Sequence, residues 1–119
     1  MRGRGVAPGV AGLSPLRISS TIRDVRYEWD TRKAAENLRK HGVDFADAVA
    51  ALEDSARLEE IDTRFAYREE RVQVLGAARS RTLFVVVTYP GEGVCRIISA
   101  RKATKHEQDR YYAGDRETW

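Results

Sequence analysis

The sequence predicts one α+β domain, in which an antiparallel sheet carries two N-terminal helices and one C-terminal helix. Apolar residues recur with a helical period up to Glu53, and with the period of two that is typical of strands beyond Asp54. Connections of hairpin length make the later strands antiparallel neighbours. Thr104 and Glu107 fit a capping box, which starts a helix after the last strand. The expected order is β-α-α-β-β-β-β-α, with the helices packed on one face of the sheet.

The composition limits the class of protein. The chain has 119 residues, 42% of them apolar and 33% charged, which suits one domain with a modest core. No run approaches the roughly 20 apolar residues that a membrane span needs. Cys95 is the only cysteine, so an intrachain disulfide and a four-cysteine metal site are excluded. These features favour a cytoplasmic protein, and we expect neither a metal nor a cofactor.

Residues 1–25 are predicted to form a disordered basic tail. They contain four Gly, two Pro and three Ser, and no sustained period. The first 23 residues carry four Arg and no acid, and they lack the continuous apolar segment of a secretory signal. The folded domain is then expected to span residues 26–112, with a C-terminal tail at 113–119.

Charge is unevenly distributed along the rest of the chain. Residues 44–70 hold nine acids against three Arg, whereas residues 71–111 hold eight Lys or Arg against three acids. A basic C-terminal half beside an acidic middle suits a protein that binds nucleic acid on one surface. It also suits a basic protein partner elsewhere. Alternatively, folding brings the two segments together and they neutralise each other.

The first part of the domain predicts a strand followed by two helices. Residues 26–29 alternate as a short strand, and Asp30 is a natural N-cap for a helix over about 31–41. The period of that helix places on its inner face Ala34, Leu38 and His41. Gly42 would end it in the left-handed conformation, and Asp44 would cap a second helix over about 45–53.

The second part predicts four strands and the last helix. The strands are expected at residues 57–61, 71–76, 83–89 and 94–100. The most apolar of them, 83–89, should lie at the centre of the sheet. Residues 62–69 form a polar connection between the first two.

The stretch from Val94 to Tyr112 holds the candidate chemistry. It begins as a strand and ends as a helix, and such junctions gather backbone donors and charge in one place. Its cations are Arg96, Arg101, Lys102, Lys105, Arg110 and, if protonated, His106. Their plainest partner is a phosphate backbone, and the simpler alternative is a solvated surface helix.

Two of these arginines cannot share a face of a regular strand. Alternation points Arg96 and Arg101 to opposite faces, unless the strand bends near its end. We favour Arg101 at the site, because it lies where the strand gives way to the helix.

Three stretches, in order and in register, resemble one known family. They are Tyr27-Glu28-Trp29-Asp30 with Lys33, Asn37 and Lys40–Phe45; Tyr67-Arg68-Glu69-Glu70-Arg71 with Gly76; and Arg96–Ala103 with Glu107 and Tyr111. Together they resemble the BrnT family of toxins. The extra N-terminal tail, and Arg68 in place of the family's usual Gly, depart from the family pattern.

The resemblance implies a RelE-like α+β fold and a ribonuclease toxin that inhibits translation. It also implies a partner, a BrnA-type ribbon-helix-helix antitoxin that holds the toxin inactive. In that family the toxin–antitoxin complex binds operator DNA through the antitoxin.

A ribonuclease without a metal needs a base for the 2′-OH proton, cations for the phosphorane, and an acid for the leaving 5′ oxygen. We hypothesise that Arg101, with Arg79 or Arg81, holds the scissile phosphate. The acid–base candidates are Glu70, His41 and Tyr111, and further RNA-binding candidates are Arg96, Lys102 and Lys105. An ion pair with Arg71 or Arg101 is an equal alternative for Glu70.

Two other functions stay open on the sequence alone. A chain with this fold could be a non-catalytic co-repressor that only binds the antitoxin, which the small set of acid–base residues favours. It could also be a housekeeping RNA-binding module, although the acidic segment has no obvious use in such a protein.

Overall fold

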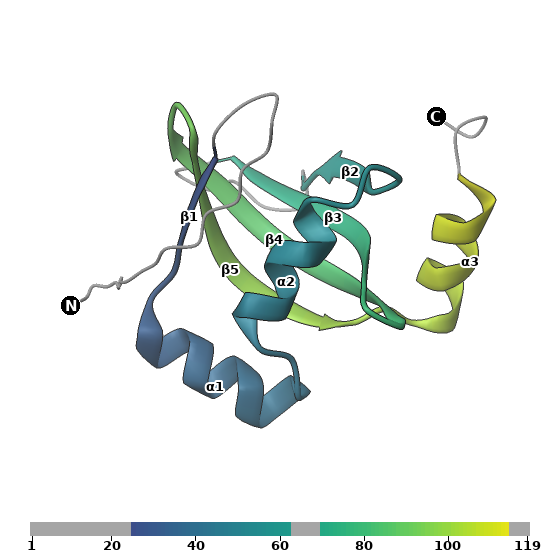
Figure 1. The fold of residues 1–119 in the computed structure, drawn as a ribbon, viewed down its shortest axis with the longest axis horizontal. Coiled ribbons are helices and arrows are strands. Elements are labelled where there is room, and N and C mark those ends of the chain that lie inside the picture. The colour runs from purple at the N-terminus through teal and green to yellow at the C-terminus, as the bar shows by residue number, and fades with distance from the viewer. Residues whose placement is uncertain (1–24, 63–69, 115–119) are drawn as a thin grey trace.

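The computed structural model describes residues 25–62 and 70–114, and it confirms the predicted order of elements (Figure 1). The strands are β1 (Arg26–Glu28), β2 (Leu58–Ile61), β3 (Arg71–Ala78), β4 (Arg81–Gly91) and β5 (Val94–Lys102), and the helices are α1 (Thr31–His41), α2 (Phe45–Leu52) and α3 (Lys105–Ala113). The predicted tails and the Tyr67 segment fall mostly or wholly outside the described residues.

The five strands form one sheet in the order β1-β5-β4-β3-β2. The predicted antiparallel pairing of β3 with β4 and of β4 with β5 is confirmed, and β2 is also antiparallel to β3. One pairing differs from a fully antiparallel sheet, because β1 runs parallel to β5. These two strands are far apart in the sequence, so no hairpin turn fixes their relative direction.

The main core lies between α2 and one face of the sheet. Its buried members include Val43, Phe45, Ala48 and Ala51 from the helical part, and Val74, Val85, Val87, Ile97 and Ala100 from the strands. A Cβ atom added at Gly76 would lie 2.1 Å from the carbonyl oxygen of Ala51. The backbone of α2 therefore rests directly on β3, and a glycine makes this approach possible.

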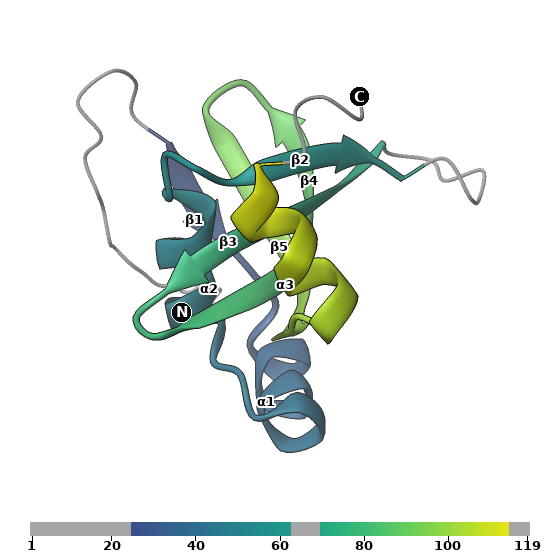
Figure 2. The same ribbon diagram turned by 90° about the vertical axis from the view of Figure 1, so that its right-hand side faces the viewer.

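α3 lies against the opposite face, so the prediction that all helices share one face is wrong. Leu75 and Phe84 pair across β3 and β4 and alternate with the residues of the main core. Both line a hollow together with Arg110 of α3. Figure 2 shows α3 in front of the sheet and α2 behind it. Leu75 and the half-buried Phe84 give the second face its own apolar surface, and α3 covers part of it.

The predicted inner face of α1 is confirmed for Ala34, which packs against the main core, and is wrong for Leu38 and His41. Leu38 is 48% exposed and His41 is exposed, whereas Asn37 is only 6% exposed. Its side-chain amide accepts a hydrogen bond from the Ala100 N–H at 3.1 Å and donates one to the Ala100 carbonyl at 2.7 Å. It also donates to the Val43 carbonyl. These bonds allow a polar residue to face the protein interior.

The predicted helix boundaries are confirmed. Asp30 and Asp44 accept hydrogen bonds from the first backbone N–H groups of α1 and α2. Gly42 has a φ of 69°, in the left-handed region, and Thr104 and Glu107 form a complete capping box. In the described ranges, no helix is long and apolar enough to cross a membrane.

A β-bulge interrupts β5 at Ile98. Val86 pairs with Ser99 and Val87 pairs with Ile97, so Ile98 has no partner on β4. Ile97 and Ala100 are three residues apart, yet both are buried in the main core. The strand therefore does bend near its end. After the bulge, the alternation of side chains between the two faces is shifted by one residue.

Candidate functional site

The sheet face that carries α3 brings together residues from every long strand. Its middle row consists of Leu75, Phe84 and Arg101, which are successive partners on β3, β4 and β5. Gln73, Val86 and Ser99 form the next row in the same way. Apart from Leu75, all of these side chains are half-buried. This face is therefore partly open, and Arg101 lies at the end of its middle row.

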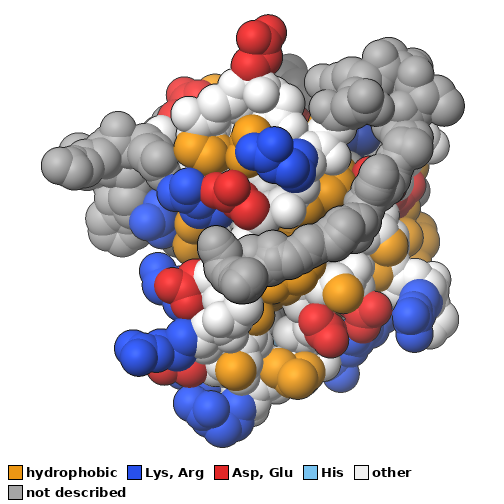
Figure 3. Space-filling model, turned by 60° about the vertical axis from the view of Figure 1, so that its left-hand side comes forward, with side chains coloured by type: hydrophobic (Ala, Val, Ile, Leu, Met, Phe, Trp, Pro, Cys, Tyr) orange, Lys and Arg blue, Asp and Glu red, His pale blue; other side chains and the backbone are white. Residues whose placement is uncertain are grey.

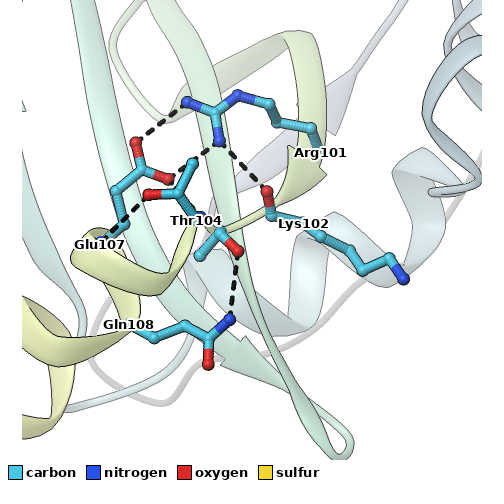
Figure 4. A network of polar contacts seen from close by, with 6 residues as sticks. Arg101, Lys102, Thr104, Glu107 and Gln108 are labelled. Atoms are coloured by element: carbon cyan, nitrogen blue, oxygen red, sulfur yellow. Dashed lines mark hydrogen bonds and ion pairs between the residues drawn. The ribbon is translucent and has the colours of Figure 1, made fainter.

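Arg101 is held by three neighbouring groups, and Figure 4 shows two of them, the Glu107 carboxylate and the Lys102 carbonyl. Its Nη1 and Nη2 donate to the two carboxylate oxygens of Glu107 at 2.9 and 3.0 Å. Nη1 also donates to the Lys102 carbonyl at 3.1 Å. The guanidinium carbon lies 4.1 Å from the centre of the Phe84 ring. A bidentate ion pair and an aromatic face together fix both the position and the plane of the guanidinium.

Glu107 serves α3 and the sheet at once. One of its oxygens accepts a hydrogen bond from the Thr104 N–H at 2.8 Å, which completes the capping box. The hydrogen bond from Arg101 is the main reason that the pKa of Glu107 lies below its ordinary value, with the Thr104 bonds adding to it. Glu107 is therefore a stable carboxylate that ties the start of α3 to Arg101.

The bulge at Ile98 places Arg96 on the same face as Arg101. Arg96 pairs with Thr88 on β4, while Arg101 pairs with Phe84, and both partners are even-numbered residues on this face. Arg96 donates to Glu28 on the adjacent β1 at 2.7 Å. Thr88, between Arg96 and Arg71 on the neighbouring strands, is 1% exposed, and its hydroxyl oxygen has no hydrogen-bond partner among the described residues.

Tyr111 reaches from α3 to Asp54, just beyond α2. Its hydroxyl donates to the Asp54 carboxylate, which also accepts from the N–H groups of Ala77 and Ala56. The hydrogen bond to Asp54 raises the pKa of Tyr111 to about 12, with burial adding to the shift. Burial alone would raise the pKa of Asp54, but the three hydrogen bonds hold it below its ordinary value. At neutral pH Tyr111 is therefore a hydrogen-bond donor rather than a base.

The structure does not bring Arg79 and Arg81 to Arg101. Both approach Asp47 on α2, at 3.6 and 3.7 Å, and α2 covers the opposite face of the sheet. Arg79 is in the tight turn between β3 and β4, with a φ of 63°, and its side chain is 80% exposed. Arg101 and these two arginines are thus separated by the sheet.

The other predicted site residues are exposed. Lys105 makes an ion pair with Asp109 one turn along α3. Glu70 precedes β3, His41 is in the last turn of α1, and Lys102 ends β5. Among the contacts of the described residues, none joins Glu70 or His41 to Arg101, Glu107 or Tyr111. The assignments of all these residues to catalysis or to RNA binding stay predictions.

Folding brings the acidic and basic segments together, as in the neutralising alternative. Ion pairs link Asp47 to Arg79 and Arg81, and Glu60 to Arg110. On the face drawn in Figure 3, blue and red side chains are interspersed and form no large area of one sign. Among the described residues, no group of three or more His, Cys, Asp or Glu side chains is arranged to hold a metal ion.

Sequence reasoning missed the partners that give the site its geometry. From the sequence, Glu107 has a capping role and a place in the family pattern, and Phe84 and Asp54 have no predicted role. The spacing of Arg101 and Glu107 across a strand-to-helix junction was a usable signal, because a capping-box carboxylate projects back toward the residues before the helix. The pairing of Phe84 with Arg101 depends on the register of β4 and β5, which no local pattern contains.

Comparisons of the sequence and of the structure with known proteins both find BrnT toxins. Residues 29–107 match the family model described as the ribonuclease toxin BrnT of type II toxin–antitoxin systems. A crystal structure of the Brucella abortus ribonuclease toxin BrnT is similar, with a TM-score of 0.51 and 25% sequence identity. The match covers 68% of this chain and 99% of that one. No curated protein sequence matches the chain significantly.

Proposed function

Since the chain belongs to the BrnT family of ribonuclease toxins of type II toxin–antitoxin systems, we propose that it cleaves RNA on the sheet face that carries Arg101. The observation that carries this placement is the arginine itself. It stands at a strand-to-helix junction, is half-buried, and is fixed by Glu107 and Phe84. Fixed cations of this kind stabilise the charge that develops on a phosphorane.

The proposed reaction is an internal transesterification that uses no metal. A base removes the proton of a ribose 2′-OH, and the 2′ oxygen attacks the adjacent phosphorus. The bond to the 5′ oxygen breaks, and an acid protonates that oxygen. The products are a 2′,3′-cyclic phosphate and a free 5′-OH. Arg101 would hold the phosphate throughout, and Glu70, His41 and Tyr111 stay the candidates for base and acid.

The geometry restricts the role of Tyr111 within this scheme. A phenol with a pKa of about 12 that donates to Asp54 is not a base at neutral pH. It could act only as an acid or as a neutral donor.

Beside the Arg101–Phe84 stack lies a shallow hollow lined by Leu58, Glu59, Glu60, Gln73, Leu75, Phe84 and Arg110. We propose that the nucleotide next to the scissile phosphate lies over this hollow.

The partners follow from the family and are part of the proposal. A type II toxin implies an antitoxin, which we propose is a BrnA-type ribbon-helix-helix protein. The complex would bind operator DNA through the antitoxin. Free toxin would act in the cytoplasm and inhibit translation by degrading RNA.

A cleavage assay with matched variants tests the function and its placement. Purified protein with defined RNA and EDTA should yield fragments ending in a cyclic phosphate. Arg101→Ala should lower the rate about 100-fold, the usual effect of losing one donor to a developing oxyanion. Arg79→Ala is the control, because this exposed arginine lies on the other face. An equal loss in both variants would place the site elsewhere.

A non-catalytic co-repressor is the second candidate. It is favoured by one observation, namely that among the described residues neither Glu70 nor His41 contacts Arg101. A folded protein that binds its antitoxin but cleaves no RNA in the same assay would establish this second function.

A further inference from the structure

Arg101 has five N–H hydrogens, and the described residues occupy three of them. Both hydrogens of Nη1 are used, one by Glu107 and one by the Lys102 carbonyl. One hydrogen of Nη2 is used, by the second oxygen of Glu107. Among residues 25–62 and 70–114, no group accepts from Nε–H or from the other hydrogen of Nη2. Two of the five donors are therefore available.

The two available donors lie side by side. A guanidinium is planar, and Nε–H points in the same direction as the neighbouring Nη2–H, so the two form a fork along one edge. Glu107 occupies the other fork, between Nη1 and Nη2. Figure 4 shows Nε on the side of the guanidinium away from Glu107 and Lys102. A fork of two parallel N–H groups matches two oxygens of one phosphate group.

The Arg101 side chain is more exposed to solvent than the Glu107 side chain with which it pairs. The Arg101 side chain is 35% exposed, and the Glu107 side chain is 17% exposed. The arginine can therefore meet a ligand that the carboxylate does not touch. Phe84 covers one flat face of the guanidinium, so this stack does not cover the edge that carries Nε and Nη2.

We propose that Glu107 is a positioning residue that holds Arg101 so that its Nε–H and free Nη2–H grip the scissile phosphate. This inference rests on the proposed ribonuclease function, and it adds a role that helix capping does not require. Without Glu107, the guanidinium could rotate about its side-chain bonds and would meet the phosphate in many orientations. Misplacement of a catalytic group by about 1 Å costs on the order of 100-fold in rate.

Glu107→Gln is the decisive variant, because it keeps the size of the side chain and removes one of two matched acceptors. Its amide NH2 would face an N–H of Arg101. We expect kcat/KM for RNA to fall roughly 10- to 100-fold. If Glu107 instead competed with the phosphate for Arg101, removing its charge would raise the rate, and that result would overturn the proposal.

Two further variants separate positioning from helix capping. Thr104→Ala removes the other half of the capping box and leaves the Arg101–Glu107 pair in place, so it should cleave at nearly the wild-type rate. In an Arg101→Ala background, adding Glu107→Gln should change the rate little, because the arginine it positions is absent. A further large loss in that background would mean that Glu107 acts through the fold alone.

A measurement without cleavage makes the test independent of activity. In ¹H–¹⁵N spectra, the Arg101 Nε–H signal, assigned by its loss in Arg101→Lys, should shift when an all-2′-deoxy oligonucleotide is added. The shift should be lost in Glu107→Gln. If the chemical shift of the Arg101 Nε–H signal in the wild type did not change on adding the oligonucleotide, the proposal would be overturned.

The two failures are distinguishable. A wild-type protein whose Arg101 signal responds to the oligonucleotide but that cleaves no RNA would contradict the proposed function and support the fork. A wild-type protein that cleaves RNA, beside a Glu107→Gln protein that cleaves equally fast, would contradict the fork and leave the function standing.

Discussion

Asn37 shows how much one buried amide contributes to the fold. It bonds both backbone groups of Ala100 and the Val43 carbonyl. β1 pairs with β5 only between Val94 and Arg96, so at Ala100 the amide takes the place of a neighbouring strand.

We expect Asn37→Ala to lower the free energy of unfolding by about 2–4 kcal/mol, because it leaves buried backbone groups without partners. Urea unfolding followed by circular dichroism measures this loss. Leu38→Ala is the matched control on the same helix, and since Leu38 is 48% exposed its effect should be much smaller. Equal losses in the two variants would mean that the amide contacts contribute little.

At the scale of elements, α3 is joined to the rest of the fold by a few polar contacts. Tyr111 reaches Asp54, Arg101 grips Glu107, and Arg110 approaches Glu60 at 3.7 Å. No residue of α3 is fully buried. The attachment of this helix therefore depends on hydrogen bonds and ion pairs more than on apolar burial.

Tyr111→Phe should lower the free energy of unfolding by about 1 kcal/mol at neutral pH, because it removes one hydrogen bond. Folding raises the pKa of Tyr111 from 10.0 to about 12, so the fold favours the protonated phenol. This contribution is complete below pH 10 and is lost as the pH rises through about 12. Unfolding free energies measured from pH 7 to 11 should therefore converge for the two proteins.

Tyr112→Phe serves as the control for that series. Tyr112 is 73% exposed, and the change keeps the ring that contacts Tyr111. A Tyr112→Phe protein that loses as much stability as Tyr111→Phe would show that the Asp54 contact is unimportant.

The sequence predicted where the elements begin and end better than it predicted how they face one another. Asp30, Asp44 and Thr104 act on their own helices, so local residue types were enough. The predicted face of α1 is correct at Ala34 and wrong at Leu38 and His41, because the helical period alone does not indicate that a polar residue, Asn37, takes the buried position.

The candidate site was predictable only in part, for the same reason. Arg101 was found from its local position at the strand-to-helix junction. Its separation from Arg79 and Arg81 depends on which face of the sheet each one takes. That choice is made by the register of three strands, through contacts distant in the sequence.

At the scale of the whole molecule, the cations of the C-terminal half are mostly neutralised. Among the described residues, at least six of the eight Lys and Arg residues between 71 and 111 form ion pairs: Arg79, Arg81, Arg96, Arg101, Lys105 and Arg110. The number of cations in this segment of the sequence is therefore larger than the number available to bind RNA phosphates on the folded surface.

The salt dependence of RNA binding measures how many of these cations contact phosphates. If all eight cations met phosphates, the slope of log K against log salt would be roughly −5 to −6 for single-stranded RNA. We expect a slope of about −1 to −2, since few phosphates should be gripped directly. Fluorescence anisotropy with an all-2′-deoxy oligonucleotide gives the slope. A slope near the larger value would mean that RNA displaces the internal ion pairs.

The bulge at Ile98 also bears on which changes of chain length this domain tolerates. In a regular strand, losing one residue turns every following side chain to the other face. Here Ile98 is the residue without a partner, so its deletion would restore simple alternation and leave Arg96 beside Glu28 and Arg101 beside Glu107. Deleting Ala100 instead would also remove the bulge and leave Arg101 opposite Phe84, but it would move the polar Ser99 into the buried position of Ala100. The strand thus has the form of one that has accepted an insertion, and Ile98 is the residue of the bulge whose deletion should disturb the neighbouring buried positions least.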